Sequence, residues 1–314
     1  MDLASGIFGR LVRARDRAYA NGRLGVAHLP RPVVSIGNLR VGGSGKTPTV
    51  IALGQALQQQ GLRLDVLSRG YRRASSKLAI AETGDEDVTQ VGDEPKLIAA
   101  RLGAPVLVHP DRFRAGLEGE RRFQPQLHLL DDGFQHRQLY RNFDLVLVAP
   151  GDLEDRLLPA GRLRELPRAL ARAHAVLWVG DEASFAAAQP QLAALTQAKL
   201  LRGEKRAQPL DEIPSRPVAF CGLARPESFW ETLAELGVVP VARQTFRDHH
   251  HYSLRDLARL RARAQAAGAD GFITTAKDAV NLPTPLPHLR VVEIAMHIPA
   301  IQELTAIIRE ACGL

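Results

Sequence analysis

One segment near the N-terminus constrains the fold of this chain more than any other. It reads Val33-Val-Ser-Ile-Gly-Asn-Leu-Arg-Val-Gly-Gly-Ser-Gly-Lys-Thr-Pro48, a β-branched strand that runs into a glycine loop and the start of a helix. Backbone N–H groups of such a loop can face phosphate oxygens, and the N-terminus of the helix adds partial positive charge. The segment therefore predicts an α/β fold that holds a nucleotide triphosphate.

The side chains at the end of the loop have separate expected roles. Lys46 reaches the β- and γ-phosphates, and the Thr47 hydroxyl binds Mg²⁺. Arg40 stands where the usual pattern has a glycine, so we interpret the loop as a variant. A glycine-rich turn with a surface lysine is the alternative, and the apolar helix that follows disfavours it. The predicted nucleotide contacts in this segment are Gly42, Gly43, Ser44, Gly45, Lys46, Thr47 and Pro48.

Composition narrows the classes of partner. The chain has 314 residues and a net charge of +7, which suits phosphate-bearing ligands or an anionic membrane surface. Aromatic residues make up only 5%, and no nucleic-acid recognition motif occurs, so we predict no nucleic-acid partner. Cys221 and Cys312 are too few for a disulfide framework or a metal cluster, which indicates a reducing cytoplasm.

The first 29 residues predict a basic amphipathic helix. It could lie in a membrane interface and attract anionic headgroups, or it could pack on the domain with its arginines in water. No stretch is long enough to span a bilayer, and no signal peptide is present. Its apolar and basic residues are interleaved: Leu3, Ile7, Phe8, Leu11 and Val12 with Arg10, Arg13, Arg15 and Arg17.

Short β-rich runs alternate with helical patterns along the rest of the chain. This alternation predicts a P-loop-like, mostly parallel, doubly wound sheet with its ligand at the carboxyl ends of the strands. A polar, proline-containing stretch then indicates a linker to a second, smaller α/β domain. The expected units are the helix at 1–29, a P-loop domain at 30–203, a linker at 204–217 and the smaller domain at 218–314.

The predicted elements are as follows. Strands are expected at Val33–Ile36, Leu64–Leu67, Pro105–Val108, Leu127–Leu130, Phe143–Val148 and Ala175–Val179, and beyond the linker at Val218–Cys221, Val239–Thr245, Phe272–Thr274 and Val291–Ile294. Helices are expected at Gly45–Gln59, Asp93–Leu102, Asp111–Arg121 and Glu182–Leu195.

Two adjacent carboxylates, Asp131 and Asp132, follow the strand that ends at Leu130. P-loop enzymes place the acid of their second motif there, where it holds Mg²⁺ directly or through water. A single aspartate after a strand is often a helix cap, but two followed by Gly, Phe, Gln and His favour a metal site.

Asp93 and Glu94 begin a predicted helix, where acidic residues are ordinary helix-start chemistry. Their interest rises with the run Asp248-His-His-His251 in the second domain. Adjacent histidines cannot all face one ion on a regular element. A proton-handling role fits better, with a histidine that orients an aspartate as it takes a hydroxyl proton.

Other loops supply positive charge. Arg69 follows the second strand, and Arg162 and Arg164 lie beside Glu165 in a later loop, where arginines can neutralise phosphoryl charge. The segment Thr274–Asp278 either caps a helix through Thr275 or binds ligand, and we favour the cap.

Together these motifs resemble one family, the tetraacyldisaccharide 4'-kinases of lipid A biosynthesis. The resemblance covers nearly the whole chain in order. It rests on Ser35-Ile-Gly-Asn-Leu, Val41-Gly-Gly-Ser-Gly-Lys-Thr-Pro, Leu67-Ser-Arg-Gly-Tyr, Gly92-Asp-Glu-Pro, Asp131-Asp-Gly-Phe-Gln-His, Leu158-Pro-Ala-Gly-Arg-Leu-Arg-Glu, Phe246-Arg-Asp-His-His and Thr274-Thr-Ala-Lys-Asp.

The resemblance implies transfer of the γ-phosphoryl of ATP to the 4'-hydroxyl of a tetraacylated glucosamine disaccharide 1-phosphate. It implies ATP and Mg²⁺ as cofactors and a peripheral position on the cytoplasmic face of the bacterial inner membrane. No obligate protein partner is inferred. Asp93 matches the catalytic base and His249 its partner, although the run of three histidines leaves open which imidazole faces Asp93.

The remaining site predictions follow the same motifs. Lys46 is assigned to catalysis, Thr47, Asp131 and Asp132 to the metal, Arg164 and Glu165 to the nucleotide, and Arg69, Tyr71, Glu94, Gln135 and His136 to the substrate. The alternative function is a membrane-associated switch ATPase of the deviant P-loop type. A switch has no use for an Asp–His base built from two domains. A nucleic-acid-dependent NTPase needs a platform that the sequence does not supply.

Overall fold

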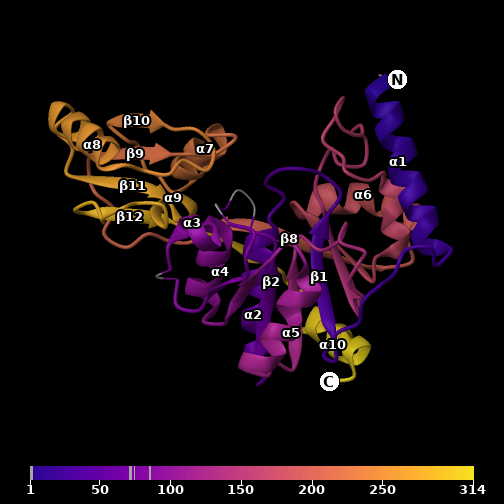
Figure 1. Cartoon of the computed structure of the whole chain (residues 1–314). Coiled ribbons are helices and arrows are strands. Elements are labelled where there is room, and N and C mark those ends of the chain that lie inside the picture. The colour runs from indigo at the N-terminus through magenta and orange to yellow at the C-terminus, as the bar shows by residue number, and fades with distance from the viewer. Residues whose placement is uncertain (1–2, 71–72, 74, 85) are drawn as a thin grey trace.

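The computed structural model describes residues 3–70, 73, 75–84 and 86–314, which form two β-sheets (Figure 1). The large sheet has nine strands in the order β13-β8-β7-β6-β1-β5-β2-β4-β3. Neighbours are parallel except at the two edges, where β3 runs antiparallel to β4 and β13 antiparallel to β8. Its strands are β1 (Val33–Asn38), β2 (Leu64–Ser68), β3 (Ala79–Ala81), β4 (Val106–Val108), β5 (Leu127–Asp131), β6 (Phe143–Val148), β7 (Ala175–Val179), β8 (Lys199–Ala207) and β13 (Ile294–His297).

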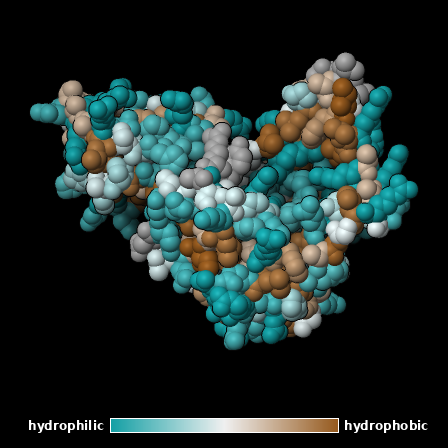
Figure 2. Space-filling view, in the orientation of Figure 1, coloured by the Kyte–Doolittle hydropathy of each residue, from teal (hydrophilic) through white to brown (hydrophobic). Residues whose placement is uncertain are grey.

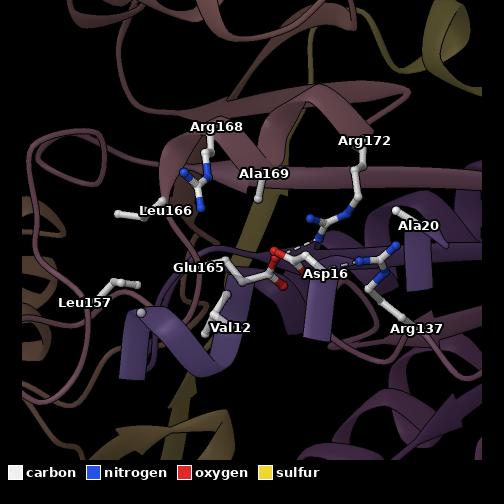
Figure 3. Close-up of a pocket in the computed structure, with 11 residues that line it drawn as sticks. Val12, Asp16, Ala20, Arg137, Leu157, Glu165, Leu166, Arg168, Ala169 and Arg172 are labelled. Atoms are coloured by element: carbon white, nitrogen blue, oxygen red, sulfur yellow. Dashed lines mark hydrogen bonds and ion pairs between the residues drawn. The ribbon is translucent and has the colours of Figure 1, made fainter. Parts of the chain in front are cut away.

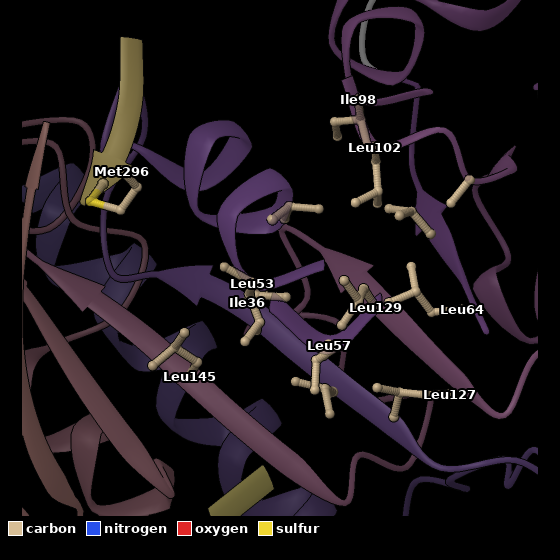
Figure 4. Packing of buried hydrophobic residues seen from close by; sticks show 14 of the residues in the cluster. Ile36, Leu53, Leu57, Leu64, Ile98, Leu102, Leu127, Leu129, Leu145 and Met296 are labelled. Carbon is tan, nitrogen blue, oxygen red and sulfur yellow. The ribbon is translucent and has the colours of Figure 1, made fainter. Parts of the chain in front are cut away.

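Helices cover both faces of the large sheet. Alternate strand residues face opposite sides: Ile36 belongs to the core under α2, while Val33 belongs to the core under α5. Figure 4 shows the first of these cores, where Leu53 and Leu57 of α2 lie against the sheet. On that face lie α2 (Lys46–Gln59), α4 (Asp93–Leu102) and α10 (Ile301–Cys312); on the other lie α1 (Leu3–Ala20), α5 (Arg112–Phe123), α6 (Glu182–Leu195) and the 3₁₀ helix η1 (Pro167–Arg172). The short α3 (Val88–Val91) precedes α4.

The small sheet has four parallel strands in the order β10-β9-β11-β12. Leu257 and Leu260 of α8 pack in the core of one face, and Phe229 and Leu233 of α7 pack in the core of the other. The elements are β9 (Pro217–Cys221), α7 (Glu227–Glu235), β10 (Ala242–Thr245), α8 (Leu254–Ala266), β11 (Gly271–Thr275), α9 (Ala276–Ala279) and β12 (Leu289–Val292). The doubly wound fold with a second, smaller α/β unit is confirmed.

The C-terminal part of the chain departs from the sequence prediction. The expected strand Val291–Ile294 is two strands, β12 in the small sheet and β13 in the large one, with Glu293 between them. Met296 and Leu304 pack in the core of the large unit. The segment from Ile294 onward therefore belongs to the large unit, whereas the predicted range 218–314 had assigned it to the small one. Strand β8 likewise extends to Ala207, inside the predicted linker 204–217, because it pairs with the returning strand β13. Pairing over a long sequence separation decides both boundaries.

The N-terminal helix is shorter than expected. It ends at Ala20 rather than near residue 29, and Gly22 follows with φ of 66°, a left-handed conformation that suits glycine. Helix α1 lies on the side of the molecule away from the small sheet, and Figure 2 shows the surface hollowed between them. Within the described residues, no helix combines the length and hydrophobicity needed to cross a membrane.

Candidate functional site

The glycine loop joins β1 to α2 at the carboxyl ends of the central strands. Gly42 and Gly45 both have φ of 93°, which favours glycine at each position. A Cβ added at Gly42 or Gly43 would meet no atom within 4 Å, so this part of the loop is open. An open loop at a helix N-terminus leaves room for a polyphosphate beside its N–H groups.

Lys46 is held above this loop. Its Nζ donates to Asn38 Oδ1 at 3.3 Å and to Ser44 Oγ at 3.4 Å, and it lies 3.6 Å from Asp132 Oδ1. The structure thus brings together the loop and the second motif, as predicted. The sequence analysis gave no role to Asn38, the last residue of β1. Its carboxamide at the end of the strand before the phosphate loop could have indicated a contact with Lys46.

Arg164 forms an ion pair with Asp132. Arg164 Nη1 donates to Asp132 Oδ2 at 2.8 Å and Nη2 to Oδ1 at 2.7 Å, a bidentate pair that also reaches Asn38 Oδ1. Burial works to raise the pKa of Asp132, but the hydrogen bonds from Arg164 and the charge of Lys46 outweigh it and hold the pKa below its usual value. The carboxylate is therefore ionised and faces the phosphate loop.

Asp131 is the more buried of the two carboxylates and accepts a hydrogen bond from Ser68 Oγ at 3.1 Å. Burial, together with the nearby charges of Glu94 and Asp132, raises the pKa of Asp131. Burial likewise raises the pKa of Glu94. The charge of Lys46 acts on all three carboxyl groups, those of Asp131, Asp132 and Glu94, and works to lower the pKa of each.

These oxygens fit Mg²⁺ held jointly by protein and nucleotide. Mg²⁺ prefers oxygen ligands and is usually bound by one or two carboxylates plus substrate phosphates. The described residues contain no group of three or more His, Cys, Asp or Glu side chains arranged to hold a metal alone. Half-buried Thr47 follows Lys46 in the first turn of α2. Its hydroxyl oxygen can therefore serve as a Mg²⁺ ligand together with the carboxylates of Asp131 and Asp132.

Asp93 and His249 meet across the two sheets. His249 Nδ1 lies 2.7 Å from Asp93 Oδ2, and the two side chains are only 14% and 8% exposed. The backbone of His249 has φ of 58°, and its N–H donates to the carbonyl of Gly222 at 3.3 Å. A Cβ at Gly222 would come 2.8 Å from the carbonyl oxygen of Arg247, so a larger residue there would displace the loop that carries His249.

The other two histidines have different surroundings. His250 stacks on Phe246 with ring centroids 4.7 Å apart, and its Nε2 lies 3.2 Å from Asp256 Oδ2. His251 is exposed. Of the three imidazoles, His249 is the one that faces Asp93, beside a cavity of about 520 Å³ lined by residues 247–251.

Lys277 joins this pair, and the sequence analysis gave it no role, because it favoured a helix cap over ligand binding for the segment Thr274–Asp278. The cap exists: Thr275 Oγ1 accepts from Asp278 N at 3.1 Å at the start of α9. Beside it, Lys277 Nζ lies 3.1 Å from His249 Nε2 and 3.8 Å from Asp93 Oδ2. Burial works to raise the pKa of Asp93, but the hydrogen bond with His249 and the charge of Lys277 lower it below its usual value.

Lys205 also lies at the loop and was missed, because its strand was read as the start of a linker. Its Nζ donates to the carbonyl of Gly43 at 3.3 Å. A Cβ at Gly45 would fall 2.9 Å from Lys205 Cε and 2.8 Å from Met296 Cε. Burial, followed by the charges of Arg40, Arg225 and Lys46, lowers the pKa of Lys205.

Glu165 is not brought to the nucleotide loop. Its Oε2 accepts from Arg172 at 2.8 Å, and its Oε1 lies 3.4 Å from Arg15 of α1. Figure 3 shows this carboxylate in a cavity of about 250 Å³ between α1 and the segment 157–172. Arg164 and Glu165 are adjacent in an irregular segment and point to different sides, so only Arg164 reaches the loop.

The next residues to place are those that the sequence predicted to bind the substrate. Gln135 Nε2 donates to the carbonyl of Asn38 at 2.9 Å. Burial and the charges of Arg112 and Arg141 lower the pKa of His136 to about 4, so its imidazole is neutral at pH 7. Arg69 is exposed, and Tyr71 lies outside the described residues.

The comparisons with known proteins agree with one another. The profile of a family described as Tetraacyldisaccharide-1-P 4'-kinase matches residues 1–312. A tetraacyldisaccharide 4'-kinase of Koribacter versatilis is 43% identical over 291 residues, covering 90% of this chain and 88% of that protein. One from Geobacter metallireducens is 40% identical over 301 residues, covering 91% and 88%. The crystal structure of "apo" form LpxK from Aquifex aeolicus in complex with ATP superposes with a TM-score of 0.81 at 29% identity, covering 98% of this chain and 97% of that one.

Proposed function

Because this chain belongs to the tetraacyldisaccharide-1-P 4'-kinase family, we propose how its own residues carry out the family's reaction. That reaction is the ATP-dependent phosphorylation of a tetraacyldisaccharide 1-phosphate in lipid A biosynthesis. The roles proposed below fall to two groups of side chains, one at the glycine loop and one where the small sheet meets α4.

Asp93 acts as the general base. Its carboxylate accepts the proton of the 4'-hydroxyl as the oxygen attacks the γ-phosphorus, and His249 fixes the orientation of that carboxylate through the 2.7 Å contact. The low pKa of Asp93 keeps it ionised at neutral pH, so it can accept a proton without first losing one. The cavity beside residues 247–251 gives the sugar of the acceptor a place next to this pair.

The glycine loop and its neighbours position the triphosphate. The backbone N–H groups of residues 42–45 bind phosphate oxygens, and Lys46 neutralises charge on the transferred group. Arg164 holds Asp132 in place and adds positive charge beside it. Thr47, Asp131 and Asp132 would hold Mg²⁺, which supplies charge neutralisation between the phosphates. Phosphoryl transfer needs little more than this positioning and electrostatic stabilisation.

One observation carries the proposal: an aspartate of the large unit and a histidine of the small unit are buried against each other beside the loop. A switch ATPase of the deviant P-loop type, the alternative, activates only water and has no small acceptor. It gives no reason for a base that is completed by a second unit.

The test is transfer of labelled γ-phosphate from ATP to tetraacyldisaccharide 1-phosphate in detergent micelles, with release of inorganic phosphate measured in parallel. We expect phosphorylated lipid in step with ADP, and negligible phosphate release without acceptor. Asp93→Asn, which keeps the shape of the side chain, should lower kcat by ~10²–10⁴-fold while binding ATP normally. Rapid ATP hydrolysis that neither needs the lipid nor responds to Asp93→Asn would favour the switch.

We also propose that α1 attaches the enzyme to the membrane that contains its lipid substrate. One face of the helix is docked: Ser5 Oγ donates to the carbonyl of Leu157 at 3.1 Å, and Phe8 packs on the core under η1. The opposite face is free, with Ile7 51% and Leu11 64% exposed one turn apart. Figure 2 shows hydrophobic surface near the end of the molecule where Figure 1 places the N-terminus.

An apolar stripe flanked by arginines suits the interface of an anionic bilayer, where the arginines reach headgroups and the apolar side chains enter the acyl boundary. Ile7→Asp with Leu11→Asp should reduce sedimentation with anionic vesicles, while ATP binding stays unchanged. Val239→Asp is the matched control, because Val239 is 81% exposed on the small unit. Equal sedimentation of the double variant and the control would place the attachment elsewhere.

A further inference from the structure

The short helix α9 delivers an ammonium group to the Asp93–His249 pair. Lys277 Nζ lies 3.1 Å from His249 Nε2, 3.8 Å from Asp93 Oδ2 and 3.7 Å from Asp248 Oδ1. Its side chain is only 22% exposed. The proposed base assigns no role to this lysine.

The position of Lys277 is firmly held by its neighbour. Asp278 is 2% exposed, and its Oδ1 accepts from Gly222 N and from the hydroxyl of Tyr252, both at 2.8 Å. Its Oδ2 accepts from Thr275 Oγ1 at 2.5 Å. The same Gly222 accepts through its carbonyl from His249 N, so α9 and the loop that carries His249 share one anchor. Lys277 and His249 are therefore fixed relative to each other.

The contact between Lys277 and His249 defines a tautomer. A lysine ammonium has three donors and no acceptor, so it can contact Nε2 of an imidazole only if that nitrogen carries no proton. The proton of the neutral ring then sits on Nδ1, where it donates to Asp93 Oδ2 at 2.7 Å. An imidazole whose Nε2 already accepts from lysine cannot take the proton of the acceptor hydroxyl through that atom.

We propose that Lys277 is a positioning residue for phosphoryl transfer: its ammonium binds Nε2 of His249, so the ring presents Nδ1–H to Asp93 and leaves this carboxylate as the proton acceptor of the pair. The inference rests on the proposed role of Asp93 and deepens it. Without Lys277, Nε2 is no longer held as an acceptor, and Asp248 Oδ2, 3.7 Å away, favours the tautomer that carries its proton on Nε2. In that tautomer Nδ1 cannot donate to Asp93, so the carboxylate loses the contact that orients it.

The first measurement is the tautomer itself, read from ¹⁵N–¹H correlation spectra of the full chain labelled at histidine. His249→Gln identifies the resonances. At pH 7 we expect an unprotonated Nε2 and a protonated Nδ1 for His249 in the wild type, and a protonated Nε2 in Lys277→Met. A protonated Nε2 in the wild type overturns the inference, whether or not any variant folds.

The second measurement is steady-state transfer to the lipid acceptor. Lys277→Met should lower kcat by about 10–100-fold with less than about a two-fold change in KM for ATP, because a positioning effect is expressed in the transition state. Lys277→Arg keeps the charge and should recover part of the loss. Lys199→Met is the control, since Lys199 is half exposed and pairs with Glu303 on the large unit.

Asp93→Asn is measured beside these variants to separate two failures. If Asp93→Asn loses kcat but Lys277→Met does not, the present inference is wrong and the base assignment stands. If Asp93→Asn keeps its kcat, the base assignment is wrong and the inference that rests on it falls too. If Lys277→Met raises KM for either substrate and leaves kcat unchanged, the lysine binds substrate and does not position His249.

Discussion

A double-mutant cycle on Asp93 and His249 tests whether the two side chains act as a unit. Both are largely buried, and 2.7 Å separates His249 Nδ1 from Asp93 Oδ2, so solvent screens their interaction little. General base catalysis contributes ~10²–10⁴-fold, so Asp93→Ala should raise the transfer barrier by about 3–5 kcal/mol. A hydrogen bond to a charged group is worth about 1.5–3 kcal/mol, so loss of His249 should lower kcat by roughly 10–100-fold.

The combination of the two changes is decisive. Once the carboxylate is gone, His249 has no base to orient, so the double variant should be about as slow as Asp93→Ala alone. The coupling energy then equals the effect of the histidine, about 1.5–3 kcal/mol, which lies within the range for residues in direct contact. His249→Gly is the suitable substitution, because the backbone at this position has φ of 58° and glycine adopts it without strain.

The assay is kcat for phosphate transfer to the lipid at saturating ATP, with thermal unfolding of each variant as a check on folding. His28→Ala is the matched control and should give wild-type kcat, since the exposed side chain of His28 lies outside both the Asp93–His249 pair and the cavity at residues 247–251. If the effects of Asp93→Ala and His249→Gly multiply in the double variant, the two residues act independently and the proposed pair is refuted.

Three further outcomes are expected. Lys46→Ala should lower kcat by several orders of magnitude, because the lysine charge stabilises the transferred phosphate, while lipid binding in a vesicle assay persists; near-normal turnover would remove the loop from the mechanism. Lys205→Met should raise KM for ATP several-fold with little change in KM for the lipid, since Lys205 Nζ contacts the carbonyl of Gly43; unchanged ATP kinetics would make it a purely structural contact. Thr47→Val should raise the Mg²⁺ concentration that gives half-maximal transfer, and an unaltered Mg²⁺ titration would contradict the assignment of this hydroxyl.

The sequence by itself determined the architecture of the large unit and the place of the phosphate loop. Glycines at 42 and 45 are required by local backbone geometry, and the strand before them and the helix after them follow from short-range patterns. Asp131 and Asp132 were also predictable, because carboxylates at the end of a buried strand next to such a loop can face it in any parallel sheet of this kind.

The pairing of strands that lie far apart in the sequence could not be predicted from such local patterns. The run around Val291–Ile294 has one apolar pattern, yet its two halves join different sheets, because the partner of each half is chosen by strands far away in the sequence. Lys205 reaches the loop for the same reason, since β8 is placed by its pairing with β7 and β13.

The Asp93–His249–Lys277 arrangement shows the division most clearly. The sequence supplied an acidic helix start, a run of three histidines and a lysine after a strand, but each had an ordinary explanation and no local rule joins positions so far apart. Only the tertiary structure selects His249, because Gly222 and the anchor at Asp278 fix its loop, while Phe246 and Asp256 engage His250. Local backbone chemistry is encoded within a few residues, whereas the meeting of two units is decided by packing over the whole chain.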